Sequence, residues 1–148
     1  MDGNIPSEVQ ALESLQTVRL SNNHLHGTLP PELGSMPNLR RLYLDRNELT
    51  GELATSFGGL VGLEILSLWD NSLSGNLPAS VTVLERLEEV LMELNFFSGP
   101  IPDFLPRGPM RRIQLGYNLF DGALPDTLYQ LSSLEELNLA SNELEGTL

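Results

Sequence analysis

The chain repeats one pattern of residues at an almost constant interval. In the stretch "LSNNHLHGTLP", residues 20–30, Asn23 is followed by Leu25, Gly27, Leu29 and Pro30. The same phase returns at five further asparagines, and the successive intervals are 24, 24, 24, 23 and 24 residues. A fixed period in this range indicates a repeat architecture, in which each unit stacks on its neighbours. The asparagines that mark the repeats are Asn23, Asn47, Asn71, Asn95, Asn118 and Asn142.

The residues before each asparagine alternate between apolar and polar positions. In the first repeat Val18 and Leu20 fall on one side of an extended segment, and Thr17 and Arg19 fall on the other. This alternation is typical of a half-buried strand. Because one such unit cannot bury its apolar side alone, the pattern predicts one short strand per repeat, stacked into a parallel sheet over a continuous core.

The asparagine, glycine and proline positions predict how each turn of the chain closes. The six asparagines are expected to be structural, since their amides can satisfy backbone groups that the inward bend leaves unpaired. A glycine follows each bend, where a residue without Cβ permits unusual dihedral angles or close approach. The prolines that come next direct the chain into the opposite wall. One residue is missing from the fourth interval, and we place this shortening at residues 105–110.

The complete motif, Leu-x-x-Leu-x-x-Leu-x-Leu-x-x-Asn-x-Leu followed by Gly-x-(Ile/Leu)-Pro, resembles the plant-type leucine-rich repeat. The chain is similar in this to the ectodomains of plant receptor-like kinases and to polygalacturonase-inhibiting proteins. The resemblance implies an α/β fold, a right-handed solenoid with a parallel sheet on its concave face and short irregular or 3-10 segments on its convex face. It covers residues 1–148 as a single domain of about six repeats of 23–24 residues.

The two ends of the chain fall within repeats. Gly3 and Pro6 begin the chain at the phase at which Gly146 ends it, and neither end has the atypical sequence of a capping repeat. We therefore interpret the chain as an excerpt of a longer array, and we expect end-to-end self-association through exposed core edges. A place outside the cell or at its surface follows only if the chain is part of a receptor-like protein. The sequence itself has no signal peptide, cysteine or N-glycosylation sequon.

The charge of the chain is strongly acidic. Twenty acidic residues stand against eight arginines and no lysine, for a formal net charge of −12. Binding to nucleic acids or to anionic membranes depends on neutralising phosphate charge, so both are disfavoured as partners. No apolar run approaches the roughly 20 residues of a membrane span. A basic peptide or protein is easier to accommodate, although acidity also serves solubility alone.

The strand positions predict which side chains face the concave surface. The only tryptophan, Trp69, lies two residues before Asn71, at a position that alternation turns toward solvent. Exposed apolar clusters mark interaction sites, and tryptophan, tyrosine and arginine are enriched in binding hot spots. Cross-strand stacking that only stabilises the sheet is the alternative explanation. The predicted patch consists of Tyr43, Ile65, Trp69, Leu91, Leu94 and Tyr117, with Phe96 and Leu119 at its rim.

Two arginines complete the predicted ligand-binding set. Arg112 lies between Glu89 and Glu136 in one column, and such alternating signs predict ion pairs between neighbouring strands. Arg41 has no acidic neighbour in its own column, so we expect it to be the freer arginine and a direct ligand contact.

Catalysis and metal binding find little support. Glu89 and Glu93 would lie about 13 Å apart on an extended strand, which is too far for the paired carboxylates of a glycosidase. His24 and His26 can share a face with Glu48, but a tetrahedral metal site needs three or four converging ligands. The sequence contains no nucleophile motif or phosphate loop. We therefore expect a non-enzymatic protein without cofactor or metal.

The sequence favours a recognition module that binds a protein or peptide on its concave face. The alternative is a polysaccharide or cell-wall ligand on the same aromatic patch, because aromatic rings also stack on sugars.

Overall fold

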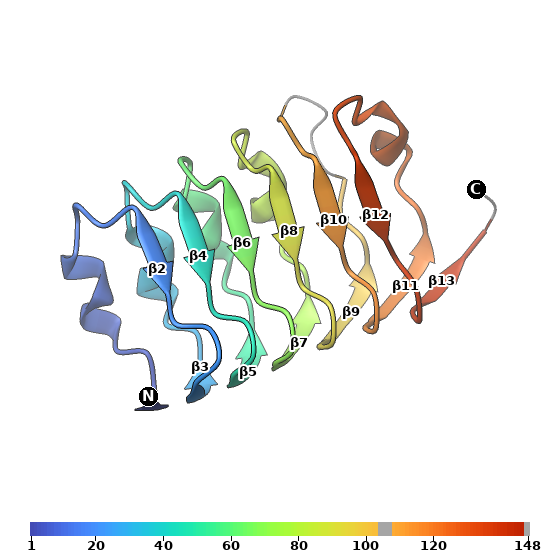
Figure 1. Cartoon of the computed structure of the whole chain (residues 1–148). Helices are drawn as coiled ribbons and strands as arrows, with labels where there is room; N and C mark the ends of the chain where they lie inside the picture. The colour runs from blue at the N-terminus through green and yellow to red at the C-terminus, as the bar shows by residue number, and fades with distance from the viewer. Residues whose placement is uncertain (104–107, 147–148) are drawn as a thin grey trace.

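The computed structural model describes residues 1–103 and 108–146 and shows a stack of similar turns (Figure 1). Each turn runs through a short strand, a bend, a second strand and, in five turns of the described residues, a short helical segment. All strand pairs are parallel, and each strand inside a sheet pairs with its counterparts in the turns before and after it. The predicted α/β solenoid is confirmed.

The first sheet contains the strands that the sequence predicts. Its six strands follow the order of the turns, and the register sets Leu42 beside Leu66 and Leu66 beside Val90. These central residues are buried, whereas their neighbours in each strand turn to the other side. The strands are β2 (Thr17–Arg19), β4 (Arg41–Tyr43), β6 (Ile65–Ser67), β8 (Glu89–Leu91), β10 (Arg112–Gln114) and β12 (Glu136–Asn138).

A second parallel sheet, of seven strands, was not predicted. It begins directly after each bend, so the expectation of one strand per turn is wrong. Stacking brings the extended segments after the bends into register, and backbone N–H and C=O groups that would otherwise be unpaired then bond between turns. The strands are β1 (Asp2–Gly3), β3 (His24–Thr28), β5 (Glu48–Glu52), β7 (Ser72–Asn76), β9 (Phe96–Pro100), β11 (Leu119–Ala123) and β13 (Glu143–Glu145).

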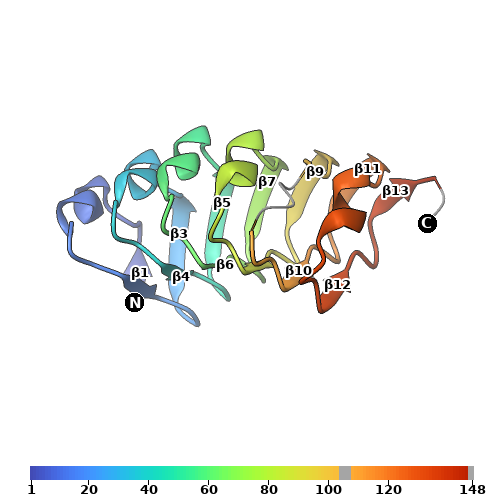
Figure 2. The same cartoon turned by 90° about the horizontal axis from the view of Figure 1, so that it is seen from above.

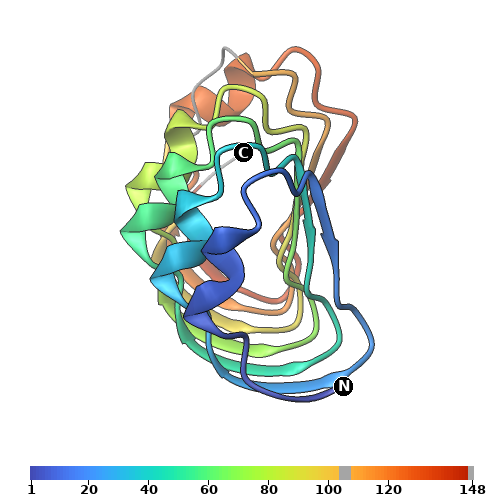
Figure 3. The same ribbon diagram turned by 90° about the vertical axis from the view of Figure 1, so that its left-hand side faces the viewer.

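Short 3-10 helices form the wall opposite the first sheet (Figure 3). Four of them follow directly on a proline, Pro6, Pro30, Pro78 or Pro125, whose fixed φ leads the chain out of the second sheet. No helix in the described residues is long and apolar enough to cross a membrane. Residues 105–107 of the predicted shortening lie outside the described residues. The helices are η1 (Ser7–Ala11), η2 (Pro31–Ser35), η3 (Thr55–Gly59), η4 (Ala79–Val83) and η5 (Asp126–Gln130).

The asparagine side chains link each bend to the previous turn. The amide of Asn71 donates to the carbonyl oxygens of Leu68 in its own turn (3.0 Å) and Leu44 in the previous turn (3.1 Å). Its side-chain oxygen accepts a hydrogen bond from the backbone N–H of Leu49 at 3.1 Å. Asn95 repeats this pattern one turn later. One side chain therefore satisfies backbone groups of two turns.

Replacement of Asn71 by leucine is expected to lower the free energy of unfolding by about 1–3 kcal/mol, because buried backbone groups lose their partners. Urea unfolding followed by circular dichroism measures this change. Asn76→Leu is the matched control, since Asn76 is exposed and should tolerate the same substitution. Equal unfolding midpoints for the two variants would contradict a structural role for Asn71.

Candidate functional site

The first sheet arranges the side chains that point away from its core in columns along the array. The register places Tyr43 beside Ser67 and Ser67 beside Leu91. Since neighbouring strands are about 4.8 Å apart, side chains within a column can touch. Figure 2 shows the array bowed with the helical segments on the outside of the curve. We call the side of the first sheet that points away from the core, on the inside of the curve, the concave face.

Trp69 lies on the concave face, two residues after the end of strand β6. Its side chain is half-buried, while that of the preceding residue, Leu68, is fully buried. The guanidinium carbon of Arg46 lies 4.4 Å from the centre of the indole ring, which is a cation–π contact. The sequence pattern did not predict this contact with Arg46. The indole is thus held in place from the neighbouring turn without entering the core.

A shallow pocket opens beside Trp69. Hydrogen bonds fix its polar walls: the Asn138 side chain donates to Glu93 Oε1 at 2.6 Å, and the Gln114 side chain donates to Glu136 Oε2 at 3.2 Å. The pocket therefore combines one aromatic and one aliphatic wall with several fixed charges. We call it the Trp69 pocket, and it is lined by Trp69, Leu91, Glu93, Arg112, Gln114 and Glu136.

Arg112 is paired on both sides, so the predicted alternation of charges along its column is confirmed. Its side-chain nitrogens lie 3.4 Å from a carboxylate oxygen of Glu89 and 2.7 Å from one of Glu136. Arg111 and Glu135 form a parallel pair at 3.0 Å. Exposed pairs of this kind contribute little to stability, about 0.2–1 kcal/mol each. Their main effect is to orient charges along one edge of the concave face.

Arg41 has no acidic neighbour in its own column, but the expectation that it is the freer arginine is wrong. Its Nη2 lies 3.1 Å from Glu64 Oε2, and the other oxygen of the same carboxylate lies 2.8 Å from Arg40 Nη1. Glu64 belongs to the adjacent column, and its side chain reaches diagonally to both arginines. The basis for choosing Arg41 as the freer ligand contact is therefore lost.

The other members of the predicted patch fall into two groups. Tyr43, Ile65 and Leu91 are half-buried on strands of the first sheet, and Arg19 covers one face of the Tyr43 ring at 4.9 Å. Leu94 and Tyr117 instead occupy the bends between the two sheets and are exposed. Of the six, Trp69 and Leu91 line one pocket, and the role of the whole set in ligand binding stays a prediction.

One buried polar cluster was missed by sequence reasoning. Asp45 is only 8% exposed, and its Oδ1 accepts hydrogen bonds from the hydroxyls of Ser21 (2.8 Å) and Ser67 (2.9 Å). The two serines come from the turns on either side. The only sequence signal for this arrangement is the presence of a serine, Ser21 or Ser67, near Asp45 in each of the two neighbouring turns.

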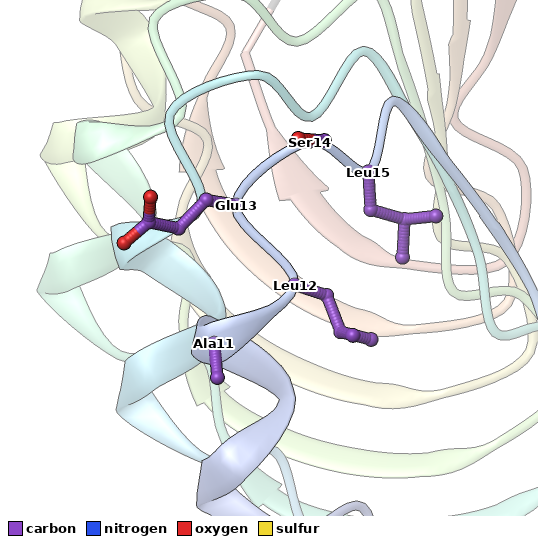
Figure 4. A pocket seen from close by; sticks show the side chains of 5 residues that line it. All are labelled: Ala11, Leu12, Glu13, Ser14 and Leu15. Carbon is purple, nitrogen blue, oxygen red and sulfur yellow. The ribbon is translucent and has the colours of Figure 1, made fainter.

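Another hollow lies at the N-terminal end of the array, in the loop after η1 (Figure 4). The side chains of Leu12 and Leu15 point toward the interior of the turn, whereas Glu13 points away. Leu12 is nevertheless 54% exposed. End-to-end association of copies through such an end stays a prediction.

The histidines form only exposed pairs. His24 Nδ1 lies 3.2 Å from Glu48 Oε1, and His26 Nε2 lies 3.6 Å from Asp2 Oδ1. Within residues 1–103 and 108–146, no three histidine or acidic side chains converge on a possible metal position. The two histidines contact different carboxylates and do not share one.

Comparison with known families identifies the repeats. A family model described as leucine-rich repeats in two copies matches residues 13–57, and a single leucine-rich repeat model matches residues 62–84. Both models describe repeats and not a catalytic family. No curated protein sequence matches the chain.

The solved structures similar to the chain include plant receptor kinases. The ectodomain of GASSHO1/SCHENGEN3 from Arabidopsis thaliana, in complex with CASPARIAN STRIP INTEGRITY FACTOR 2, is 35% identical over 99% of this chain, with a TM-score of 0.95. The Arabidopsis receptor kinase HAESA, in complex with the peptide hormone IDA and the co-receptor SERK1, is 34% identical over 99% of this chain, with a TM-score of 0.95. Pollen Receptor Kinase 3 is 31% identical over 99% of this chain, with a TM-score of 0.86.

The share of each neighbour that the chain covers differs widely. It covers 76% of the Pollen Receptor Kinase 3 structure, but only 18% of the GASSHO1/SCHENGEN3 structure and 25% of the HAESA structure. The chain thus spans a quarter or less of the two larger ectodomains.

Proposed function

The chain belongs to the leucine-rich repeat family, and from this premise we propose that it is a non-catalytic recognition module that binds a protein or peptide on its concave face. The Trp69 pocket is the centre of the proposed site. Arg112 contributes a charged wall to it, and Leu91 contributes an apolar one.

The observation that carries the proposal is the position of Trp69. A tryptophan that fills no core volume contributes little to folding, yet this one is kept in a fixed orientation by Arg46. Tryptophan and arginine are among the residues enriched in binding hot spots. Two of the similar structures hold a peptide hormone or a named factor, which supports a peptide as the ligand class.

The charges around the pocket favour a basic residue in the partner. Glu93 and Glu136 line the pocket, and its one cation, Arg112, is already paired with Glu89 and Glu136. A lysine or arginine from a partner would meet carboxylates that fixed hydrogen bonds hold in place. Such complementarity mainly raises specificity and association rate.

The carbohydrate alternative has less support on the same surface. Sugar rings stack on open aromatic faces, but Arg46 covers one face of Trp69 and Arg19 covers one face of Tyr43. A polysaccharide would have to use the remaining faces, or displace the two arginines. We therefore favour the peptide.

Trp69→Ala is expected to weaken binding of a basic peptide by about 2 kcal/mol, roughly thirtyfold. Panels of synthetic basic, neutral and acidic peptides and of cell-wall glycans would be titrated against the protein. Isothermal titration calorimetry measures the affinity of both proteins, and in the unmodified protein the fluorescence of Trp69, the only tryptophan, also reports binding. In the complex, the indole should become protected from a soluble quencher.

Tyr129→Ala provides the matched control, since Tyr129 is an exposed aromatic residue on the opposite wall, in η5. Its loss should leave peptide affinity unchanged. Binding of a glycan in place of any peptide would favour the alternative, and equal affinity of Trp69→Ala and the unmodified protein would remove the pocket from the site.

A further inference from the structure

Two neighbouring bends expose large apolar side chains. In the fourth turn Leu94 and Phe96 are 46% and 54% exposed, and in the fifth turn Tyr117 and Leu119 are 54% and 44% exposed. We call these four residues the bend patch. In the other four marked turns, the corresponding positions are all polar: Asn22 and His24, Arg46 and Glu48, Asp70 and Ser72, and Ser141 and Glu143.

Backbone hydrogen bonds join the two bends that carry the bend patch. The backbone N–H of Asn95 donates to the carbonyl of Tyr117 at 3.3 Å, and that of Leu94 donates to Gly116 at 3.2 Å. Strands β9 and β11, which begin with Phe96 and Leu119, are direct neighbours in the second sheet. The four side chains therefore project from one short stretch of the edge where the two sheets meet. Contiguous exposed apolar surface of this kind marks interaction sites.

Backbone conformation makes two of these residues costly for folding. Leu94 and Tyr117 have φ values of 54° and 55°, in the left-handed region. Asparagine and aspartate tolerate this region, whereas bulky side chains rarely occur there. Burial in the core does not offset this conformational cost at either residue, since both side chains are exposed. Strain that is kept without a gain in packing is a sign of function.

The charges around the bend patch are negative. Asp70 and Glu143 occupy the bend positions of the turns on either side, and Asp121 follows Leu119 by two residues in β11. Within the described residues, no salt bridge neutralises these three carboxylates. Arg112 lies at the far end of strand β10, five residues before Tyr117. The patch is thus apolar at its centre and acidic at its rim.

We propose that the bend patch is a second docking surface, separate from the concave face, for a protein segment that carries aliphatic or aromatic side chains flanked by lysines or arginines. The apolar side chains of the partner cover Leu94, Phe96, Tyr117 and Leu119, and its cations meet the acidic rim. The chain then holds two partners at once, or two parts of one partner. This surface does not require the Trp69 pocket.

The test uses three short synthetic peptides: one with a Leu-Phe-Ile core flanked by lysines, one with the same core flanked by glutamates, and one with a serine core flanked by lysines. Side-chain NMR of the intact chain locates each peptide. The lysine-flanked apolar peptide should shift the resonances of the bend patch. The other two peptides should bind at least tenfold more weakly.

The decisive variant combines Leu94→Asn, Phe96→Ser, Tyr117→Asn and Leu119→Ser. It should lose at least tenfold in affinity for the lysine-flanked apolar peptide. The pair Leu94→Asn and Tyr117→Asn alone should leave the melting midpoint unchanged or raise it, because asparagine suits the left-handed conformation. Val83→Ser with Tyr129→Ser removes exposed apolar surface elsewhere and should leave peptide affinity unchanged.

Three results would overturn the proposal. No shift at the bend patch with any of the peptides would show that the surface does not dock such a segment. Peptide binding that Trp69→Ala abolishes and the fourfold variant keeps would locate the peptide on the concave face. Concentration-dependent association of the chain that only the fourfold variant prevents would make a second copy the occupant. The titration of Trp69→Ala with basic peptides tests the concave face separately, so the proposal for the Trp69 pocket and the proposal for the bend patch can each fail without the other.

Discussion

Phe97→Ala is expected to lower the free energy of unfolding by about 3–5 kcal/mol, the range for removing a buried phenylalanine. The Phe97 side chain is fully buried and stacks on Phe120 of the next turn, with ring centres 6.3 Å apart and planes 13° apart. In three earlier turns the same position is leucine: Leu25, Leu49 and Leu73. Alanine would therefore leave a cavity between two turns and also remove an aromatic contact worth about 0.5–1.5 kcal/mol.

The controls for this prediction come from the same strand. Phe96→Ala removes an equal side chain that is half exposed and should cost much less, while Phe97→Leu restores the residue used by other turns and should be intermediate. The backbone N–H of Phe97 bonds to Asn118 Oδ1 at 3.0 Å, and all of these variants keep that group. Unfolding in guanidinium chloride measures the free energy of unfolding of each variant. Equal costs for Phe96 and Phe97 would contradict the assignment of Phe97 to the core.

Periodicity predicted the parts of the fold that depend on local pattern. The apolar positions at fixed spacing specify which side chains enter the core, as Leu42, Leu66 and Val90 do in three successive turns. The structural role of the bend asparagines was predicted equally well, because each turn uses the same side chain for the same backbone groups. Both features are encoded within one repeat, and the sequence contains the repeat six times, so each feature can be recognised six times.

The second sheet was missed because its signal lies between turns. Segments such as His24–Thr28 and Ser72–Asn76 contain glycine and polar residues and show only one buried apolar side chain each. Nothing in such a segment alone predicts a strand. Its extended backbone finds partners only after stacking has brought the same segment of the next turn alongside.

The concave face was predicted less well than the core, for two physical reasons. Counting alternate residues assumes that the strand continues, but a positive φ at Leu94 and Tyr117 turns these side chains out of the sheet. Long side chains also reach from one column to the next, so Glu64 pairs with Arg41 although the two residues lie in different columns. Assigning residues to columns by counting along the sequence reveals neither how far a side chain reaches nor how the backbone bends.

Leu68→Ala is expected to lower the free energy of unfolding by about 2–5 kcal/mol. Leu68 is fully buried, and the matching positions in the turns on either side, Leu44 and Met92, are fully buried as well. Alanine keeps the backbone bonds, including the N–H donated to Leu91 at 2.8 Å. The loss is therefore one of volume and contact, and its size depends on how far the neighbours can move into the cavity. The unbranched Met92 is the neighbour best able to do so.

Trp69→Ala separates core from surface at the adjacent position. It removes a larger side chain than Leu68→Ala does, yet it should cost only about 0.5–1 kcal/mol, the worth of an exposed cation–π contact with Arg46. Chemical unfolding followed by circular dichroism compares the two variants without relying on tryptophan fluorescence. If Trp69→Ala unfolds the chain while Leu68→Ala is tolerated, the alternation is one residue out of register. In that case the indole belongs to the core, and neither the Trp69 pocket nor its proposed role in recognition would stand.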